Sequence, residues 1–504
     1  MKPLSREAVG KLRGNIVRFF TDESNFRFVF VAALLCASLN VIRFWFYVAT
    51  GIFMIWAAFL FGYRLLYQQR IRRIRNRRLI LLFLGSALLT CFIQFSFNIF
   101  VNIYYVAWMG ICLFMFYGVH ADKSRRSCAL EVSRILDLIN AVTTIMMTAG
   151  IILLVIFPKG FEFCGDAFAI HENRFVGILF NANVTAFYAL MALISCNLLW
   201  VIRQSLGRLS IRLKVFYIVC CVINIFSLFI SDSNASLLML IVYLCFISFY
   251  VIFKGYKRGF VSMLFRIIAL ILACVVAASF MLGARTLVQS GTSAVLSMLS
   301  PHTQISTGVT SKPDENIIII KPDDRPETTF EHQNTNIDSG RFKIWRQSAE
   351  MFRLFPVFGV GKGNVVDYGK TYLGGLRYED FHNGLITIAV CYGAVGLFLF
   401  MVLAITIAKA MLKAIFRYRS ENRRDCRVLM YITAFCAGYC VYSMFEVALL
   451  VDISYRVVIF WLFIGLAMSY VCSYERSAIT AGENIPERSR SIRRAAAYLS
   501  SSRT

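Results

Sequence analysis

The chain has 504 residues, of which 58% are hydrophobic and only 16% are charged. About 25% of the residues of a soluble domain are charged, so this composition excludes a soluble globular protein and indicates a multi-span membrane protein. The formal net charge of +25 is typical of nucleic-acid-binding proteins, but the positions of the basic residues argue against nucleic acid as a partner.

Twelve apolar stretches follow a polar, basic segment of 27 residues that has no cleavable leader pattern. Each is close to the roughly 20 residues that a helix needs to cross a bilayer. The predicted spans are 28–42, 45–66, 79–97, 100–119, 130–157, 176–202, 215–230, 236–253, 260–283, 381–408, 428–446 and 456–473. The expected fold class is an all-α integral membrane protein with about 12 transmembrane helices and one long extracytoplasmic loop between spans 9 and 10.

Most of the 53 lysines and arginines fall in segments that lie on one side of the membrane if the N-terminus is cytoplasmic. The positive-inside rule therefore places both termini in the cytoplasm, and the basic segments are expected to attract anionic membrane lipids. Five regions follow: a basic cytoplasmic N-terminus (1–27), a nine-span block (28–283), an extracytoplasmic loop (284–380), a three-span block (381–473) and a basic cytoplasmic tail (474–504).

The long loop has two parts. Residues 290–338 are rich in polar residues and proline, and we expect them to be irregular, with a short strand at 317–320. An amphipathic helix is predicted after them, near residues 340–355, with a cap at 338–340 and Pro356 beyond its end. Its apolar stripe would be Phe342, Trp345, Ala349 and Phe352.

The glycines at 359, 361 and 363 predict a tight loop that turns the chain back toward the membrane. They do not form a nucleotide-binding motif, because no strand–turn–helix pattern surrounds them. No cysteine or histidine pattern predicts a metal site, and no cofactor is expected.

His382 and Arg341 are the main candidates for chemistry. His382 follows Glu379 and Asp380, and a histidine beside a carboxylate can act as a general base near neutral pH. Arg341 carries a planar, permanent cation that suits phosphate. The alternatives are a helix-end histidine facing water and a solvated arginine. Other polar residues fall at the same predicted outer level: Arg43, Arg174, Asn181, Asn183, Ser231 to Asn234, Glu446, Asp452 and Arg456.

The order and spacing of these motifs resemble the O-antigen ligase and polymerase superfamily. The motifs are Arg174-Phe-Val-Gly177 with Asn181-x-Asn183, Arg341-x-x-x-Trp345, Pro356-x-x-Gly359-x-Gly361, His382-Asn383-Gly384 and Gly393-x-x-Gly396. The twelve-span layout with a long loop between spans nine and ten resembles the family as well. Together these features cover most of the chain.

The resemblance implies a GT-C-type glycosyltransferase in a bacterial cytoplasmic (inner) membrane. Such enzymes transfer a glycan from an undecaprenyl-diphosphate carrier to a hydroxyl of a glycan or lipid acceptor, without a metal or cofactor. His382 would be the base, and Arg341 would hold the carrier diphosphate. The residues that would complete the substrate site are Arg174, Asn181, Asn183, Asn383 and Asn234. Ligase and polymerase activities both fit.

One position departs from the family pattern. Many members carry an arginine at the outer end of the seventh span, where this chain has Asn234. Either Arg174 supplies the missing charge or the substrate is held differently.

A lipid-linked glycan flippase or export component is the alternative from another class. It would need ionisable residues within the spans, for which Asp137 is the only clear acidic candidate. A non-catalytic scaffold would leave the loop motif unexplained.

Overall fold

The computed structural model describes residues 14–15, 17–40, 43–64, 70–163, 165–254, 260–299, 341–376, 380–417 and 423–480. Over these residues the protein is mostly helical, as predicted. Each of the twelve predicted spans overlaps a helix. These helices are α2 (Glu23–Cys36), α3 (Arg43–Tyr63), α4 (Arg77–Ile93), α5 (Ile99–Ile111), α7 (Arg125–Ile156), α8 (Ala182–Ser205), α9 (Ile211–Ile230), α10 (Asn234–Phe253), α11 (Phe260–Leu299), α14 (Gly384–Arg417), α15 (Arg423–Tyr442) and α16 (Tyr455–Thr480).

Eight helical segments in the described part of the chain are long and apolar enough to cross a membrane, so the membrane class is confirmed but the number twelve is not. The eight are Ile99–Ala121, Arg125–Ile156, Ala182–Ser205, Ile211–Ile230, Asn234–Phe253, Val261–Met298, Gly384–Phe416 and Tyr455–Ser477.

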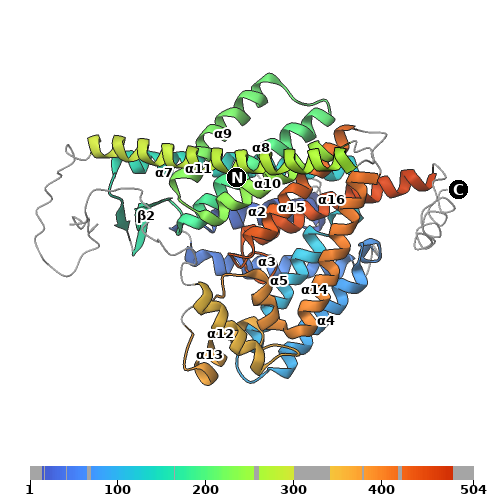
Figure 1. Ribbon diagram of the computed structural model, residues 1–504. Helices are drawn as coiled ribbons and strands as arrows, with labels where there is room; N and C mark the ends of the chain where they lie inside the picture. The colour runs from blue at the N-terminus through green and yellow to red at the C-terminus, as the bar shows by residue number, and fades with distance from the viewer. Residues whose placement is uncertain are drawn as a thin grey trace, which may run out of the picture.

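The centre of the bundle is formed by α8 and α16, since 83% of the apolar stretch of each is buried. By contrast, none of the apolar stretch of α11 is buried, and α11 lies along the outside of the bundle (Figure 1). A helix that is apolar on all sides and faces outward is suited to contact with lipid.

The first and last residues of α7 lie at opposite ends of the bundle and define those ends. The helix begins at Arg125 among basic residues and ends before a small sheet. We call the end where α7 begins and α8 stops the basic end, and the end where α7 stops and α8 and α14 begin the histidine end. In Figure 1 the sheet lies at the left and the C-terminal part of α16 at the right.

The small sheet was not predicted, and it is a minor addition to a mostly helical protein that agrees with the all-α class. It is antiparallel, in the order β1 (Phe161–Phe163), β2 (Asp166–His171) and β3 (Arg174–Gly177). Span six was predicted from residue 176, but α8 starts at Ala182 and Arg174 lies on β3. The strands were missed because each has six residues or fewer.

The predicted loop also begins later than expected. Residues 284–299 continue α11 as helix rather than as loop. The stretch contains no proline, and its Leu296 is buried while Val288 packs against the core. The predicted strand at 317–320 and the helix cap at 338–340 lie outside the described residues.

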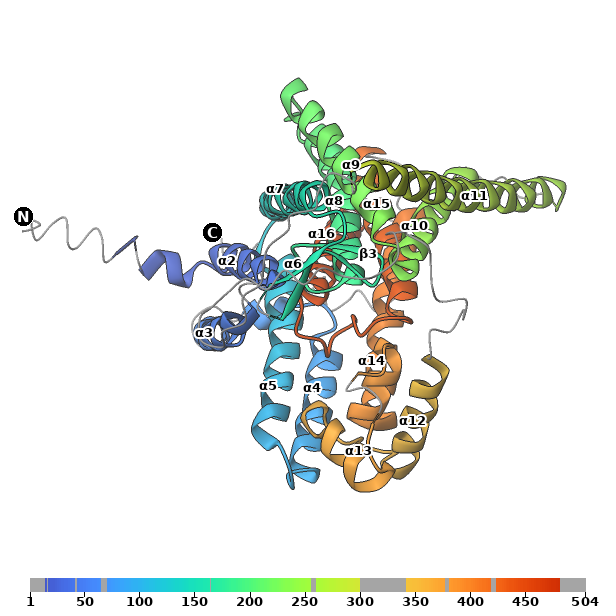
Figure 2. The ribbon, with the colours of Figure 1, turned by 90° about the vertical axis from the view of Figure 1, so that its left-hand side faces the viewer.

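Short helices complete the histidine end. The loop helix α12 (Arg341–Leu354) confirms the predicted amphipathic helix, but its buried face is Ile344, Ser348 and Met351. The predicted stripe was wrong in part, because Phe342 is 65% exposed. A turn of 3-10 helix, η6 (Lys362–Asn364), and α13 (Val365–Leu373) follow. Figure 2 shows α12 and α13 beside the lower ends of α4, α5 and α14.

At the basic end, α5 continues through a π-helical turn, η4 (Cys112–Phe116), into the short α6 (Val119–Asp122). The 3-10 helix η3 (Arg70–Arg73) precedes α4. A π-helical turn leaves carbonyl groups outside the normal helical ladder, and two of them accept hydrogen bonds from arginines described below.

Candidate active site at the histidine end

The glycine series forms the re-entrant loop that the sequence predicted. Residues 356–361 lie in a break of α14, where Gly393 has φ +66° and ψ −170°. Backbone bonds join the two segments: Ala394 N donates to Pro356 O at 2.7 Å and Gly361 N donates to Cys391 O at 2.8 Å. A Cβ atom on Gly393 would lie 2.2 Å from Val357 O, so this packing requires glycine.

Polar side chains of α4, α5 and their connection hold the other side of the loop. Thr90 donates to Phe358 O at 2.7 Å, and Asn98 donates to Gly363 O at 3.1 Å. The Asn102 carboxamide accepts from Gly363 N at 2.7 Å. These amides satisfy backbone groups that would be costly to leave unpaired at membrane depth, and they fix the loop below His382.

His382 lies in a tight turn just before α14 and has φ +47°, a left-handed conformation that is uncommon for residues other than glycine. The turn is anchored on the side of α14. Asn383 caps the helix by accepting from Leu385 N and Ile386 N, both at 3.0 Å, and donates to Met444 O at 3.1 Å. The backbone therefore sets where the half-buried His382 ring lies. Unusual backbone of this kind clusters at functional sites.

Asp380, on the other side of the turn, forms an ion pair with Lys362 of η6. Burial alone would raise the pKa of Asp380, but Lys362, His382 and Arg456 together lower it below its ordinary value. Asp380 is thus an anion that interacts electrostatically with His382 and links it to the re-entrant loop. Glu379 lies outside the described residues.

Arg341 begins α12, which is tied to the same turn. Trp345 Nε1 donates to Phe381 O at 3.1 Å, and the Arg341 guanidinium lies 5.6 Å from the centre of the Phe445 ring. Among the described residues, Arg341 makes no ion pair. Its cation is held by an aromatic face next to the segment that Asn383 contacts.

Arg174 is held by neutral acceptors. Its guanidinium donates to Ser231 O at 3.2 Å, Asp232 O at 3.1 Å and the Asn183 carboxamide oxygen at 2.7 Å. Burial lowers the pKa of Arg174, with a further contribution from the positive charge of Arg341, against the opposing carboxylates. Arg174 and Arg341 are therefore near enough for their charges to influence each other.

A chain of polar contacts links Arg174 to the turn before α16. Asn183 donates to Glu446 at 3.2 Å. The other oxygen of Glu446 accepts from Arg456 at 3.3 Å, and Arg456 also donates to Asp452 at 2.9 Å. Arg456 thus pairs with both the Glu446 and the Asp452 carboxylates, which indicates a structural role for these three residues.

Arg285 is the functional candidate that the sequence analysis missed. It lies on the extension of α11, which had been assigned to the loop, and donates to the Asn234 carboxamide at 2.8 Å. It also pairs with Asp232 at 3.2 Å, a carboxylate that accepts a hydrogen bond from Gln289 at 3.1 Å. A cation therefore does lie next to Asn234, but it comes from another helix. Its helical context was the available signal, because no helix-breaking residue separates it from span nine.

The other predicted residues have defined places. Asn181 caps α8 by accepting from Asn183 N at 2.7 Å. Asp137 forms an ion pair with Arg203 and accepts from Tyr217 at 3.2 Å. Within the described residues, no three potential metal ligands come together. The side chain of Arg43 lies outside the described residues.

One of the comparisons with known proteins finds a match. Residues 219–401 match the family model described as O-antigen ligase. The match runs from within α9 to within α14 and so includes Arg285, Arg341 and His382. No curated protein matches the sequence. The resemblance predicted from the motifs is thus confirmed: residues 219–401 match the O-antigen ligase domain, and this match supports the resemblance to the O-antigen ligase and polymerase superfamily.

Proposed function

We propose that the protein is a glycosyltransferase of the bacterial cytoplasmic membrane. It transfers or polymerises glycan from an undecaprenyl-diphosphate carrier onto an acceptor hydroxyl, and the histidine end faces the outside of the cell. The observation that carries the proposal is the family match over residues 219–401, which spans the turn of His382, the start of α12 at Arg341 and the Arg285 segment of α11.

In the proposed reaction, a ring nitrogen of His382 accepts the proton of the acceptor hydroxyl. The hydroxyl oxygen then forms a bond to the anomeric carbon of the donor glycan. The bond from that carbon to the carrier diphosphate breaks, and its electron pair leaves with the diphosphate. A positioned histidine contributes typically about 10²–10⁴-fold to such a step.

The negative charge on the departing diphosphate needs cations that are already in place. Arg341 and Arg174 are suited to this role because one lies on an aromatic face and the other on neutral oxygens. Neither has its charge cancelled by a direct ion pair among the described residues. Arg285 also lies beside Asn234, but its charge is paired with the Asp232 carboxylate. Asn183 and Asn234 would orient the substrate, whereas Asn181 and Asn383 act mainly as helix caps.

His382→Ala and Arg341→Ala test the proposal. We expect each to lower transfer of a lipid-linked glycan by about 100-fold or more, while the protein still inserts in the membrane. His171→Ala and Arg346→Ala are matched controls, because both residues are exposed. Full transfer by both test variants would refute the chemistry.

The flippase alternative needs a separate assay. The protein is reconstituted in liposomes that hold the lipid-linked glycan in the inner leaflet only, and acceptor is added on the side that the histidine end faces. A glycosyltransferase is expected to form a new glycosidic bond between glycan and acceptor. Movement of the carrier between leaflets without bond formation would instead favour transport.

A further inference from the structure

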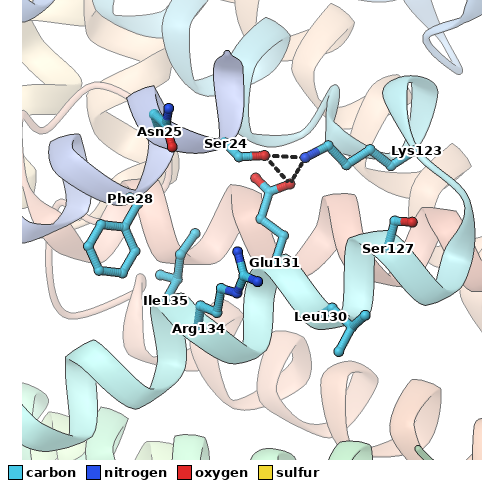
Figure 3. Close-up of a pocket in the computed structure, with 9 residues that line it drawn as sticks. All are labelled: Ser24, Asn25, Phe28, Lys123, Ser127, Leu130, Glu131, Arg134 and Ile135. Atoms are coloured by element: carbon cyan, nitrogen blue, oxygen red, sulfur yellow. Dashed lines mark hydrogen bonds and ion pairs between the residues drawn. The ribbon is translucent and has the colours of Figure 1, made fainter. Parts of the chain in front are cut away.

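A second polar site lies at the basic end, at the opposite end of α7 from Arg174. It is a pocket of about 390 Å³ between the starts of α2 and α7 (Figure 3). Its wall contains hydroxyl, amide and charged groups next to apolar groups. The residues that line it are Ser24, Asn25, Phe28, Lys123, Ser127, Leu130, Glu131, Arg134 and Ile135.

The polar wall is built by a network of ion pairs. Lys123 Nζ lies 2.6 Å from Glu131, and Ser24 donates to the same carboxylate oxygen at 2.9 Å. The other oxygen of Glu131 accepts from the buried Arg27 at 2.6 Å. Figure 3 shows the Ser24, Lys123 and Glu131 side chains converging at one edge of the pocket.

The charges of this region do not cancel. Three cations, Arg27, Arg64 and Lys123, surround two carboxylates, Glu23 and Glu131. Arg134, which lines the pocket and is exposed, makes no ion pair among the described residues and adds another positive charge. A pocket with excess positive charge and the exposed Ser127 hydroxyl is suited to a phosphate group.

The remaining wall is apolar. Phe28 is 39% exposed, and the partly exposed Leu130 extends the pocket along α7, while Ile135 is fully buried behind them. A free phosphate ion would gain nothing from these side chains, whereas an acyl chain would cover them. The two walls therefore match a molecule with an anionic head and an apolar tail.

We propose that this pocket binds the phosphodiester headgroup of an anionic phospholipid. Arg134, Lys123 and Ser127 face the phosphate, and Phe28 and Leu130 contact the first part of an acyl chain. Basic pockets between membrane helices bind such headgroups on the cytoplasmic side, which is the side that the charge distribution assigns to this end. The proposal does not rest on glycan transfer.

The experiment uses the full-length chain, purified in detergent, with lipid binding measured by native mass spectrometry and by thermal stabilisation. The ligands are phosphatidylglycerol, phosphatidylcholine and glycerol 3-phosphate. We expect phosphatidylglycerol to bind at least about tenfold more tightly than phosphatidylcholine, since nearby basic residues attract anionic lipid. Glycerol 3-phosphate alone should not stabilise the protein.

Two variants localise the site. Arg134→Glu reverses an exposed charge and should weaken phosphatidylglycerol binding by about tenfold. Ser127→Asp should weaken it too, although an acidic residue in the first turn of α7 favours the helix, so this variant remains informative if Arg134→Glu folds poorly. Arg212→Glu makes the same charge change on an exposed residue of α9 and should leave binding unchanged.

Three results would overturn the proposal. Equal affinity for the two phospholipids would exclude recognition of the anionic headgroup. Equal losses in Arg134→Glu and Arg212→Glu would show that the attraction is general and that the pocket is not the site. Stabilisation by glycerol 3-phosphate as strong as that by phosphatidylglycerol would identify a soluble phosphate as the ligand.

Discussion

Two buried arginines of the basic end and the two candidate substrate arginines of the histidine end are held in different ways. At the basic end, Arg27 and Arg64 are 0% and 1% exposed and both contact the Glu23 carboxylate. They also donate to Met115 O and Phe114 O of the π-helical turn. At the histidine end, Arg174 contacts only neutral oxygens, and Arg341 lies on an aromatic ring.

The difference separates structural from functional cations. Ion pairing lets a cation be buried, and removal of either partner leaves the other charge uncompensated. A cation held by neutral groups keeps its attraction for an anion from outside. The arginines of the basic end are therefore expected to govern folding, and Arg174 and Arg341 to govern substrate binding.

The largest expected effect is on folding. Arg27→Ala removes the ion pair with Glu131 at 2.6 Å and the ion pair with Glu23 at 3.4 Å. We expect a loss of stability of about 3–5 kcal/mol, measured as a lower melting temperature in detergent and a lower yield of monodisperse protein. The control is Arg212→Ala, at an exposed position. A melting temperature of Arg27→Ala equal to that of the wild type would contradict the structural role of Arg27.

At the histidine end the expected pattern is reversed. Arg174→Gln keeps a polar group that can donate to the neighbouring carbonyls but removes the positive charge. We expect about 100-fold slower glycan transfer with a much smaller fall in melting temperature than for Arg27→Ala. If Arg174→Gln lowered the melting temperature as much as Arg27→Ala does, the loss of transfer would be explained by unfolding. The distinction between structural and functional arginines would then fail.

The sequence predicted most of what depends on local pattern. Hydrophobic length located the helices, and the glycines predicted the re-entrant loop. The motif order pointed to His382 and Arg341, whose roles stay predictions. The apolar face of α12 was placed partly wrong, because Ile344 and Met351 are buried against neighbours that helical periodicity alone does not specify.

Features that depend on distant segments were not predictable. Arg285 reaches Asn234 across 51 positions of sequence, and the π-helical carbonyls accept from arginines on two other helices. The break of α14 at Gly393 was not predicted as a break, because its cause is the backbone of residues 356–361.

Gly393→Ala tests whether that break supports the histidine end. An added Cβ would overlap Val357 O, and φ +66° with ψ −170° is a conformation restricted to glycine. We expect a cost of about 1–3 kcal/mol in thermal unfolding, together with reduced transfer, because the turn of His382 lies on the same helix. Gly85→Ala is the matched control, since its Cβ would meet nothing within 4 Å. Equal behaviour of the two variants would mean that the loop adapts easily.

The smallest expected effect concerns the Lys362–Asp380 pair, which is an ion pair like those of the basic end but has a half-exposed carboxylate. Its partners lower the pKa of Asp380 below the ordinary value of about 3.9. The stability that this carboxylate contributes is therefore present above about pH 4 and is lost as the pH falls through the lowered pKa. Because solvent screens the pair, Asp380→Asn should cost at most about 1 kcal/mol at neutral pH.

The measurement is the difference in melting temperature between the wild type and Asp380→Asn from pH 7 down to pH 3. It should be small throughout and should shrink toward the acidic end, because protonation removes the charge that the variant also lacks. A difference that grows as the pH falls would show that the pKa of Asp380 in the folded protein lies above its ordinary value, so that the carboxylate becomes protonated at a higher pH than expected. In that case Asp380 could not act as the anion beside His382, and the electrostatic part of the proposed base would have to come from another group.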